Sequence, residues 1–268
     1  MIDCHLHTSF SGDGEVSPHN MILKAIDLGI KHIAITDHMD IDGATIGVHP
    51  HLPHNVGKYL STLSSLKQKY RDRIYVAVGV EAGWSKGGEA LTKQIIDSNP
   101  FEYIINAIHT VDGIDCYHTE YFLEQAKLGR GRDEVYNRYY ETILESLDAP
   151  YPFHAVAHLD YIVRNAPYAD KIYKYCEFAP ILDRLLNKII CLDKILEYNT
   201  TSYTTPLVMP QVFERYYALG GRKITFASDS HYLHNIAKNY NDAARVLKNI
   251  GFEYFTVLQD GKQIRFLI

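Results

Sequence analysis

Short apolar, β-branched runs alternate with longer amphipathic segments along this chain, and that alternation restricts the possible folds more than any other feature. The short runs predict strands at residues 2–5, 32–36, 74–80, 103–108, 155–158, 195–199 and 224–227. Apolar residues with helical spacing lie between them, near residues 21–26, 59–66, 91–95 and 136–147, and later over residues 181–189, 210–219 and 237–250. This order is typical of repeated βα units around a parallel sheet.

The chain has the length and continuity of a single domain. Its 268 residues are close to the usual size of single α/β barrels, and no linker rich in Gly, Pro or Ser and no short repeat divides it. We therefore expect one domain over residues 1–268. Seven βα units suit either a barrel or a doubly wound open sheet, so the placement of polar residues has to distinguish the two.

Each predicted strand ends in a different group of reactive side chains. In chain order these ends read HLH, TDH, VE, IH, HLD, EYNT and SDSH. In a barrel, the carboxyl ends of all strands meet around one mouth, where active sites are built. In an open sheet, the edge strands would lie too far apart to share a site. The sequence therefore predicts an α/β fold, a distorted (β/α)7 TIM-like barrel with its site at the C-terminal ends of the strands.

The strand ends and the loop after the first strand carry nine side chains of kinds that bind metal ions. They are His5, His7, Asp13, His38, Glu81, His109, His158, Asp229 and His231. Any one of them could be a structural histidine or a capping aspartate, but their joint placement favours a metal site. Imidazole and carboxylate suit Zn, Mn or Fe, and nine ligands exceed the need of one ion. We expect two to three divalent transition-metal ions.

Charge and cysteine content restrict the partners. The net charge is -5 and no Lys/Arg cluster forms a basic stripe, which argues against a nucleic-acid partner and favours a small molecule. No apolar stretch approaches 18 residues and the first residues leave no room for a signal peptide, so we expect a cytoplasmic protein without a membrane partner. The four cysteines are widely separated and predict neither a disulfide framework nor a cysteine zinc site. The oligomeric state stays open.

The series HxH, TDH, E/H and SDxH resembles the PHP (polymerase and histidinol phosphatase) superfamily, whose members are distorted seven-stranded barrels with a trinuclear metal cluster. Within it, HTVDGIDCY after the fourth predicted strand and FHAVAHLDYI around the fifth resemble the histidinol-phosphate phosphatase branch. The resemblance implies a metal-dependent phosphomonoesterase of histidine biosynthesis, which hydrolyses L-histidinol phosphate to L-histidinol and phosphate.

The same resemblance divides the nine ligands among three ions. The first ion would be held by His5, His7, Glu81 and Asp229. Glu81 would bridge to a second ion held by His109 and His158, and the third would be held by Asp13, His38 and His231. Some members of the superfamily have a histidine where this chain has Asp13. A carboxylate there makes the third site harder, which leaves the choice among Zn, Mn and Fe open.

Such a cluster suits hydrolysis of a phosphate monoester. Coordination lowers the pKa of water to about 7, so a hydroxide bridging two metals could attack phosphorus in line near neutral pH. No covalent phosphoenzyme is required. We expect Glu81, Asp229 and His231 to be the catalytic members of the ligand set.

The residues expected to contact the substrate are Arg164, His118, Tyr161 and Asn199. Arg164 follows the fifth strand at the active face, and its planar guanidinium suits two phosphate oxygens. The alternative is a surface arginine paired with Asp160 or Asp170. Arg222 precedes the seventh strand and should lie at the opposite rim. The histidines of VHPHLPHN, namely His49, His51 and His54, are expected in a solvated loop near the mouth.

Two other functions remain open at this point. The first is a PHP phosphoesterase or exonuclease acting on nucleotides or DNA, which the weak basic character of the chain disfavours and which salt-dependent oligonucleotide binding would support. The second is a non-catalytic, metal-binding regulatory module. A degenerate module of that kind would be expected to lose ligands, whereas this chain has the full set.

Overall fold

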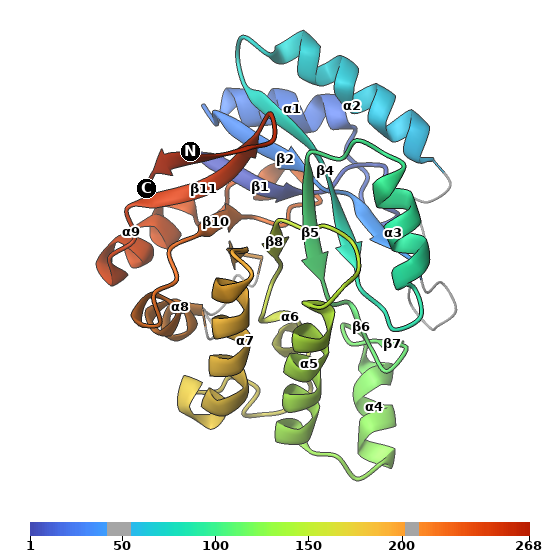
Figure 1. Ribbon diagram of the computed structural model, residues 1–268, viewed down its shortest axis with the longest axis vertical. Helices are drawn as coiled ribbons and strands as arrows, with labels where there is room; N and C mark the ends of the chain where they lie inside the picture. Colours follow the sequence, from blue (N-terminus) through green and yellow to red (C-terminus); the bar gives the residue numbers. More distant parts are fainter. Residues whose placement is uncertain (42–54, 202–208) are drawn as a thin grey trace.

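The computed structural model describes residues 1–41, 55–201 and 209–268 (Figure 1). Its central sheet is parallel between all neighbouring strands. The spatial order is β1 (Ile2–Leu6), β2 (His32–Ile35), β4 (Tyr75–Gly83), β5 (Tyr103–Ala107), β8 (Ala155–Val156), β9 (Ile195–Asn199) and β10 (Ile224–Ala227). Parallel neighbours need crossover connections, and helices supply most of them here.

The first and last strands of this order lie next to each other. Leu6 forms a parallel bridge with Ser230, and the backbone N–H of His7 donates to the carbonyl of Ser230 at 3.0 Å. The buried carboxylate of Asp3 accepts from both the backbone N–H and the hydroxyl of Ser228, at 2.9 and 2.6 Å. The sheet is therefore a nearly closed barrel, and the predicted barrel is confirmed over the open sheet.

Helices surround the strands (Figure 1). They are α1 (Pro18–Asp27), α2 (Val56–Tyr70), α3 (Glu89–Asp97), α4 (Thr119–Lys127), α5 (Arg132–Ser146), α6 (Tyr161–Arg164), α7 (Ala179–Cys191), α8 (Met209–Ala218) and α9 (Tyr240–Ile250), with 3-10 turns η1 (Tyr175–Glu177) and η2 (Leu233–Asn235). Helix α1 shows how sequence sets a boundary: the Ser17 side chain accepts from the Asn20 N–H, and Pro18 opens the first turn. Its buried face is Met21, Ile22 and Ala25, at helical spacing.

A hairpin that the sequence analysis missed closes the chain. Strands β11 (Tyr254–Gln259) and β12 (Lys262–Leu267) pair antiparallel around Asp260 and Gly261, both at positive φ. An Asp-Gly pair between two such strands is a recognised signal for a two-residue hairpin loop. The Asp260 N–H donates to the Tyr75 hydroxyl at 2.8 Å, which places the hairpin loop at the amino end of β4. The hairpin therefore lies away from the carboxyl ends that carry the predicted site.

Other differences from expectation concern short elements. Strand β3 (His38–Asp40), the pair β6 (Thr110–Val111) and β7 (Ile114–Asp115), and helix α4 were not predicted. Strand β8 has two residues instead of the expected four, and β4 runs beyond residue 80 to Gly83, so that Glu81 lies inside a strand. Two or three residues are too few to show an alternating pattern, which is why β3, β6 and β7 could not be recognised; this reason does not apply to α4, which has nine residues.

Buried apolar residues of the described ranges form one contiguous cluster that extends from β1 to β11; the single-domain prediction itself stays a prediction. Within the ranges that the structure describes, no helix is both long and apolar enough to span a bilayer. His49, His51 and His54 lie outside the described residues, so their predicted place in a loop is untested.

Candidate metal centre

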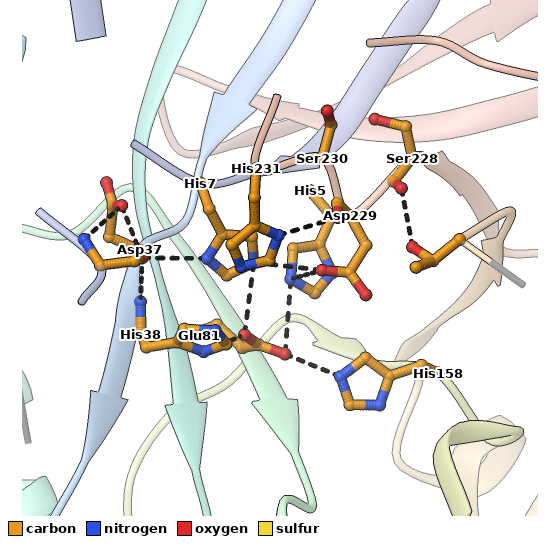
Figure 2. Close-up of polar contacts among 12 residues, drawn as sticks. His5, His7, Asp37, His38, Glu81, His158, Ser228, Asp229, Ser230 and His231 are labelled. Atoms are coloured by element: carbon orange, nitrogen blue, oxygen red, sulfur yellow. Dashed lines mark hydrogen bonds and ion pairs between the residues drawn. The ribbon is translucent and has the colours of Figure 1, made fainter. Parts of the chain in front are cut away.

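Glu81 is the centre of a buried cluster of histidines (Figure 2). Its Oε1 lies close to three Nε2 atoms: those of His158 at 2.8 Å, His109 at 3.2 Å and His5 at 3.4 Å. Its Oε2 faces His38 Nδ1 at 2.7 Å and His7 Nε2 at 3.6 Å. The β3–β4 register pairs His38 directly with Glu81, so the unpredicted strand β3 positions one of these contacts. A single carboxylate thus touches side chains from four other segments of the barrel.

Asp229 supplies the second carboxylate of the cluster. It follows β10 and has a left-handed backbone with φ 52°, a conformation that a short polar residue tolerates better than most. Its Oδ1 lies 3.2 Å from His7 Nε2 and 3.7 Å from His5 Nε2. Because His5 and His7 leave β1 on the same side, Asp229 and Glu81 hold this pair between two carboxylates.

Asp13, His38 and His231 gather at the outer side of the cluster. Asp13 Oδ2 lies 3.0 Å from His231 Nε2 and 3.6 Å from His38 Nε2. The His231 ring stacks on His7 with centroids 4.1 Å apart and an interplanar angle of 8°. The Asp13 side chain is 56% exposed, so this is the side from which solvent reaches the cluster. All nine predicted ligands therefore lie in one connected group; their assignment to individual ions stays a prediction.

The cluster has the donor atoms that metal ions need and leaves several of them unsatisfied. Within the described residues, His5 Nε2, His7 Nε2, His38 Nδ1, His231 Nε2 and Glu81 Oε2 are buried; each lies at ion-pair distance from a neighbour in the cluster but forms no hydrogen bond. Three overlapping groups have ligand atoms within 4.8 Å of one another: His7, His38 and His231; His5, His7 and Glu81; and His38, Glu81 and His109. Buried polar atoms without partners are costly, and bound cations would satisfy them. These residues fit divalent metal ions.

The close contacts between carboxylates and imidazoles shift the pKa values of Glu81 and His5. Burial opposes ionisation of Glu81, but the neighbouring His5, His109 and His38 hold its pKa well below the usual value. Burial also disfavours the charged form of His5, while Glu197 and Glu81 raise its pKa well above the usual value. Acidic pH therefore favours protons over metal ions on His5.

Two carboxylates that the sequence analysis did not select each contact the Nδ1 atom of a proposed ligand histidine. Glu197 Oε2 lies 2.8 Å from His5 Nδ1, and Asp40 Oδ1 lies 2.8 Å from His109 Nδ1. Glu197 begins the strand-end motif EYNT and Asp40 lies two residues after the motif TDH, but spacing along the chain gives no sign of which histidine each would reach. Asp37 does not join the cluster; it accepts from the backbone N–H and hydroxyl groups of Thr8 and Ser11 and so holds the loop after β1.

The Arg164 side chain lies beside the cluster at the end of α6 and is largely shielded from solvent. One terminal nitrogen donates to Asp229 Oδ2 at 3.0 Å, and the other lies 3.5 Å from Asp160 Oδ1. Its Nε and second terminal nitrogen have no hydrogen-bond partner among the described residues. The pairing with Asp160, which belongs to the alternative interpretation, does occur, but the Arg164 side chain is only 8% exposed, and Asp170 pairs with Arg132 instead.

The other predicted substrate contacts differ in their distance from the cluster. Tyr161 stacks on His158 with centroids 4.8 Å apart. Asn199 donates to Glu197 Oε1 at 2.8 Å and to Asp229 Oδ2 at 3.3 Å. His118 is half-exposed at the start of α4.

Arg164 and Arg222 lie at opposite ends of the barrel, as the sequence predicts. Arg164 follows the carboxyl end of β8, whereas Arg222 precedes β10 at the opposite end of the barrel. Arg222 donates to the backbone carbonyls of Tyr217 and Gly221 and is not part of the cluster. The two side chains therefore form a matched pair for mutational tests.

Comparison with known proteins agrees with this geometry. The PHP domain matches residues 3–201. The histidinol-phosphatase of Lactococcus lactis is 29% identical over 94% of this chain and 91% of its own length. A Clostridium acetobutylicum protein named "probable histidinol-phosphatase" is 32% identical over 93% of each chain.

A solved structure gives a similar result. The crystal structure of histidinol phosphate phosphatase from Lactococcus lactis, complexed with zinc, L-histidinol and phosphate, superimposes with a TM-score of 0.89 at 27% identity and covers 98% of both chains. The match extends over nearly the whole chain, including the segments that carry the clustered histidines and carboxylates. This chain therefore belongs to the PHP-domain family.

Proposed function

We propose that this protein is a metal-dependent histidinol-phosphatase, which hydrolyses L-histidinol phosphate to L-histidinol and phosphate. The observation that carries the proposal is the cluster around Glu81, in which buried nitrogen and oxygen atoms have no hydrogen-bond partner in the described chain. Similarity over 98% of a histidinol phosphate phosphatase that holds zinc, L-histidinol and phosphate supports the same substrate. We expect an enzyme of amino-acid biosynthesis with this activity to work in the cytoplasm.

The cluster would hold two to three divalent ions. Zinc is supported by the related crystal structure, and Mn or Fe remain alternatives because Asp13 offers a carboxylate at the outer position. Bound ions would supply Lewis-acid chemistry, polarising the phosphate oxygens and lowering the pKa of water to about 7. Glu81 contacts histidines on both sides of the cluster and is therefore the residue best placed to serve two ions.

Protein side chains complete the site. Two nitrogens of Arg164, Nε and the terminal nitrogen that lies 3.5 Å from Asp160, form no hydrogen bond in the described chain, and we assign them to the substrate phosphate. Its bond to Asp229 holds the guanidinium next to the ligand cluster. Tyr161 stacks on the ring of His158, one of the proposed ligands. Tyr161, Asn199 and His118 are proposed substrate contacts.

One experiment tests substrate and metal together. Purified protein is assayed for phosphate release against histidinol phosphate, nucleotides, sugar phosphates and an aryl phosphate, and its bound metals are measured on the same sample. We expect two to three equivalents of metal, loss of activity after chelation, and the highest kcat/KM for histidinol phosphate. Full turnover by metal-free protein, or a nucleotide as the best substrate, would overturn the proposal.

A further inference from the structure

Glu197 is fully buried in the middle of β9. Each of its carboxylate oxygens contacts a proposed metal ligand through an atom that does not face Glu81 or Asp229. Its Oε2 lies 2.8 Å from His5 Nδ1. Its Oε1 accepts from the backbone N–H of His158 at 3.2 Å and from the Asn199 amide at 2.8 Å. Because Asn199 also donates to Asp229, one carboxylate connects three of the nine ligands, which come from β1, the end of β8 and the end of β10.

The direction of the contact with His5 follows from the chemistry of the groups. An ionised carboxylate can only accept a hydrogen bond, so His5 Nδ1 must be the donor. In the neutral imidazole this leaves Nε2 without a proton, and Nε2 is the atom that faces Glu81 at 3.4 Å and Asp229 at 3.7 Å. A cation can bind only the unprotonated nitrogen. Glu197 therefore selects the tautomer of His5 that is able to be a ligand.

We propose that Glu197 is the positioning residue of the metal centre: it fixes the tautomer and ring orientation of His5 and, through its other oxygen, the backbone that presents His158. This inference rests on the metal-dependent function proposed above. Glu197 itself touches neither of the carboxylates that face the ring nitrogens, so it acts through the histidines. Partners of this kind typically change metal affinity by about 10 to 100-fold when they are replaced.

Replacement by glutamine tests the idea with little change in volume. Glutamine has one accepting oxygen and one donating NH2 group, whereas the two sides of Glu197 both need an acceptor. If the oxygen stays with His158 and Asn199, the NH2 group faces His5 Nδ1 and favours the tautomer with the proton on Nε2. That tautomer cannot bind a cation through the atom that faces the cluster.

The measurement is zinc affinity, by competition with a chromophoric chelator, for wild type, Glu197→Gln and the control Glu102→Gln. Glu102 is a carboxylate just before β5, at the amino end, where its Oε2 accepts from the Val78 N–H at 3.0 Å and its Oε1 pairs with Lys67. We expect Glu197→Gln to weaken the tightest zinc binding by about 10 to 100-fold and Glu102→Gln to leave it unchanged. Circular dichroism of the metal-free variants shows whether both retain the fold.

Repeating the substitution in a protein that lacks His5 distinguishes a positioning role of Glu197 from a general disturbance of the fold. In His5→Ala, the added change Glu197→Gln should weaken zinc binding by much less than in wild type, because the glutamine oxygen keeps the contact with His158 and the imidazole whose tautomer it disturbs is gone. Equal losses in both backgrounds, or no loss in wild type, would overturn the inference while leaving the metal-dependent function intact. A wild-type protein that binds no zinc, manganese or iron would overturn both.

If Glu197→Gln does not fold, wild-type protein still provides the test. Imidazole 15N spectra of metal-free protein above the His5 titration report which ring nitrogen carries the proton. The proposal expects His5, assigned by its loss in His5→Ala, to carry its proton on Nδ1. A proton on Nε2 would contradict it.

Discussion

At the scale of single residues, Glu81 should be the most sensitive carboxylate of the chain. It faces five imidazoles with its two oxygens, so Glu81→Gln removes charge from the centre of the cluster. We expect bound metal to fall and kcat/KM for histidinol phosphate to drop by at least about 100-fold. Glu141→Gln, on the exposed face of α5, is the matched control. Near-normal turnover with full metal content in Glu81→Gln would contradict the bridging role.

Arg164 can be tested independently of metal binding. Arg164→Ala should keep the metal and the fold but lower kcat/KM by about 100-fold, since a charge-assisted contact in a site from which water is excluded is worth roughly 2–4 kcal/mol. Arg222→Ala, at the opposite end of the barrel, should change kcat/KM little. If Arg222→Ala were the damaging change, the assignment of the phosphate contact would be wrong.

The predicted ligands could be found from sequence because their residue types are read directly at the ends of strongly patterned strands. The carboxylates that hydrogen-bond to these ligands, Glu197 and Asp40, could not be predicted from sequence. Glu197 reaches His5 across 192 positions of the chain, and Asp40 reaches His109 across 69. Such contacts depend on barrel register and side-chain rotamers, which residue spacing does not specify. The same holds for Asp3, which continues the alternation of His5 and His7 but hydrogen-bonds Ser228 instead of joining the cluster.

At the scale of elements, apolar periodicity predicted the long strands and most of the helices, but it did not predict the short strand β3 or the C-terminal hairpin. Strand β3 has three residues, and its existence depends on pairing with β4, a tertiary interaction. The C-terminal hairpin, in contrast, has a turn signal that the sequence does contain, the Asp260-Gly261 pair between its two strands. The missed β3 matters for function because it brings both His38 and Asp40 to the cluster.

The pairing of β3 with β4 gives a prediction about Gly83. A Cβ at this position would lie 1.8 Å from Asp40 Oδ1 and 3.2 Å from His109 Nδ1, so Gly83→Ala must displace the carboxylate that supports His109. We expect about 10-fold weaker metal binding and a comparable loss of kcat/KM.

Gly57→Ala is the control for Gly83→Ala. Among the described residues nothing lies within 4 Å of a Cβ at position 57, which is in α2, so this change should preserve metal binding and stabilise the helix by up to about 1 kcal/mol. Zinc affinity by chelator competition and kcat/KM by steady-state kinetics, measured on both variants, test this expectation. Unchanged zinc binding in Gly83→Ala would show that the Asp40 contact with His109 is dispensable.

At the scale of the whole molecule, the free energy of unfolding should fall in mild acid for a reason separate from the metal centre. His154 lies just before β8, at the amino end of the barrel, where its Nδ1 accepts from the Ile104 N–H at 3.0 Å. Burial, aided by the charge of Lys194, lowers its pKa from 6.5 to about 4. Between these two values the unfolded chain binds the proton and the folded protein does not. The stabilisation is therefore complete above pH 6.5 and is lost as pH falls towards 4, by up to about 1.4 kcal/mol per pH unit.

His154→Asn isolates this contribution, because the Asn side-chain oxygen can replace Nδ1 as the acceptor for Ile104 without titrating. Urea unfolding of metal-free protein at pH 7, 6 and 5 should show a shallower loss of stability in His154→Asn than in wild type. Metal-free samples are needed because proton competition at the clustered histidines adds its own pH dependence. The exposed His234, changed to Asn in the same way, is the control and should leave the wild-type slope unchanged. Equal slopes for wild type and His154→Asn would mean that His154 is protonated in the folded protein, and that its bond from Ile104 does not persist in solution.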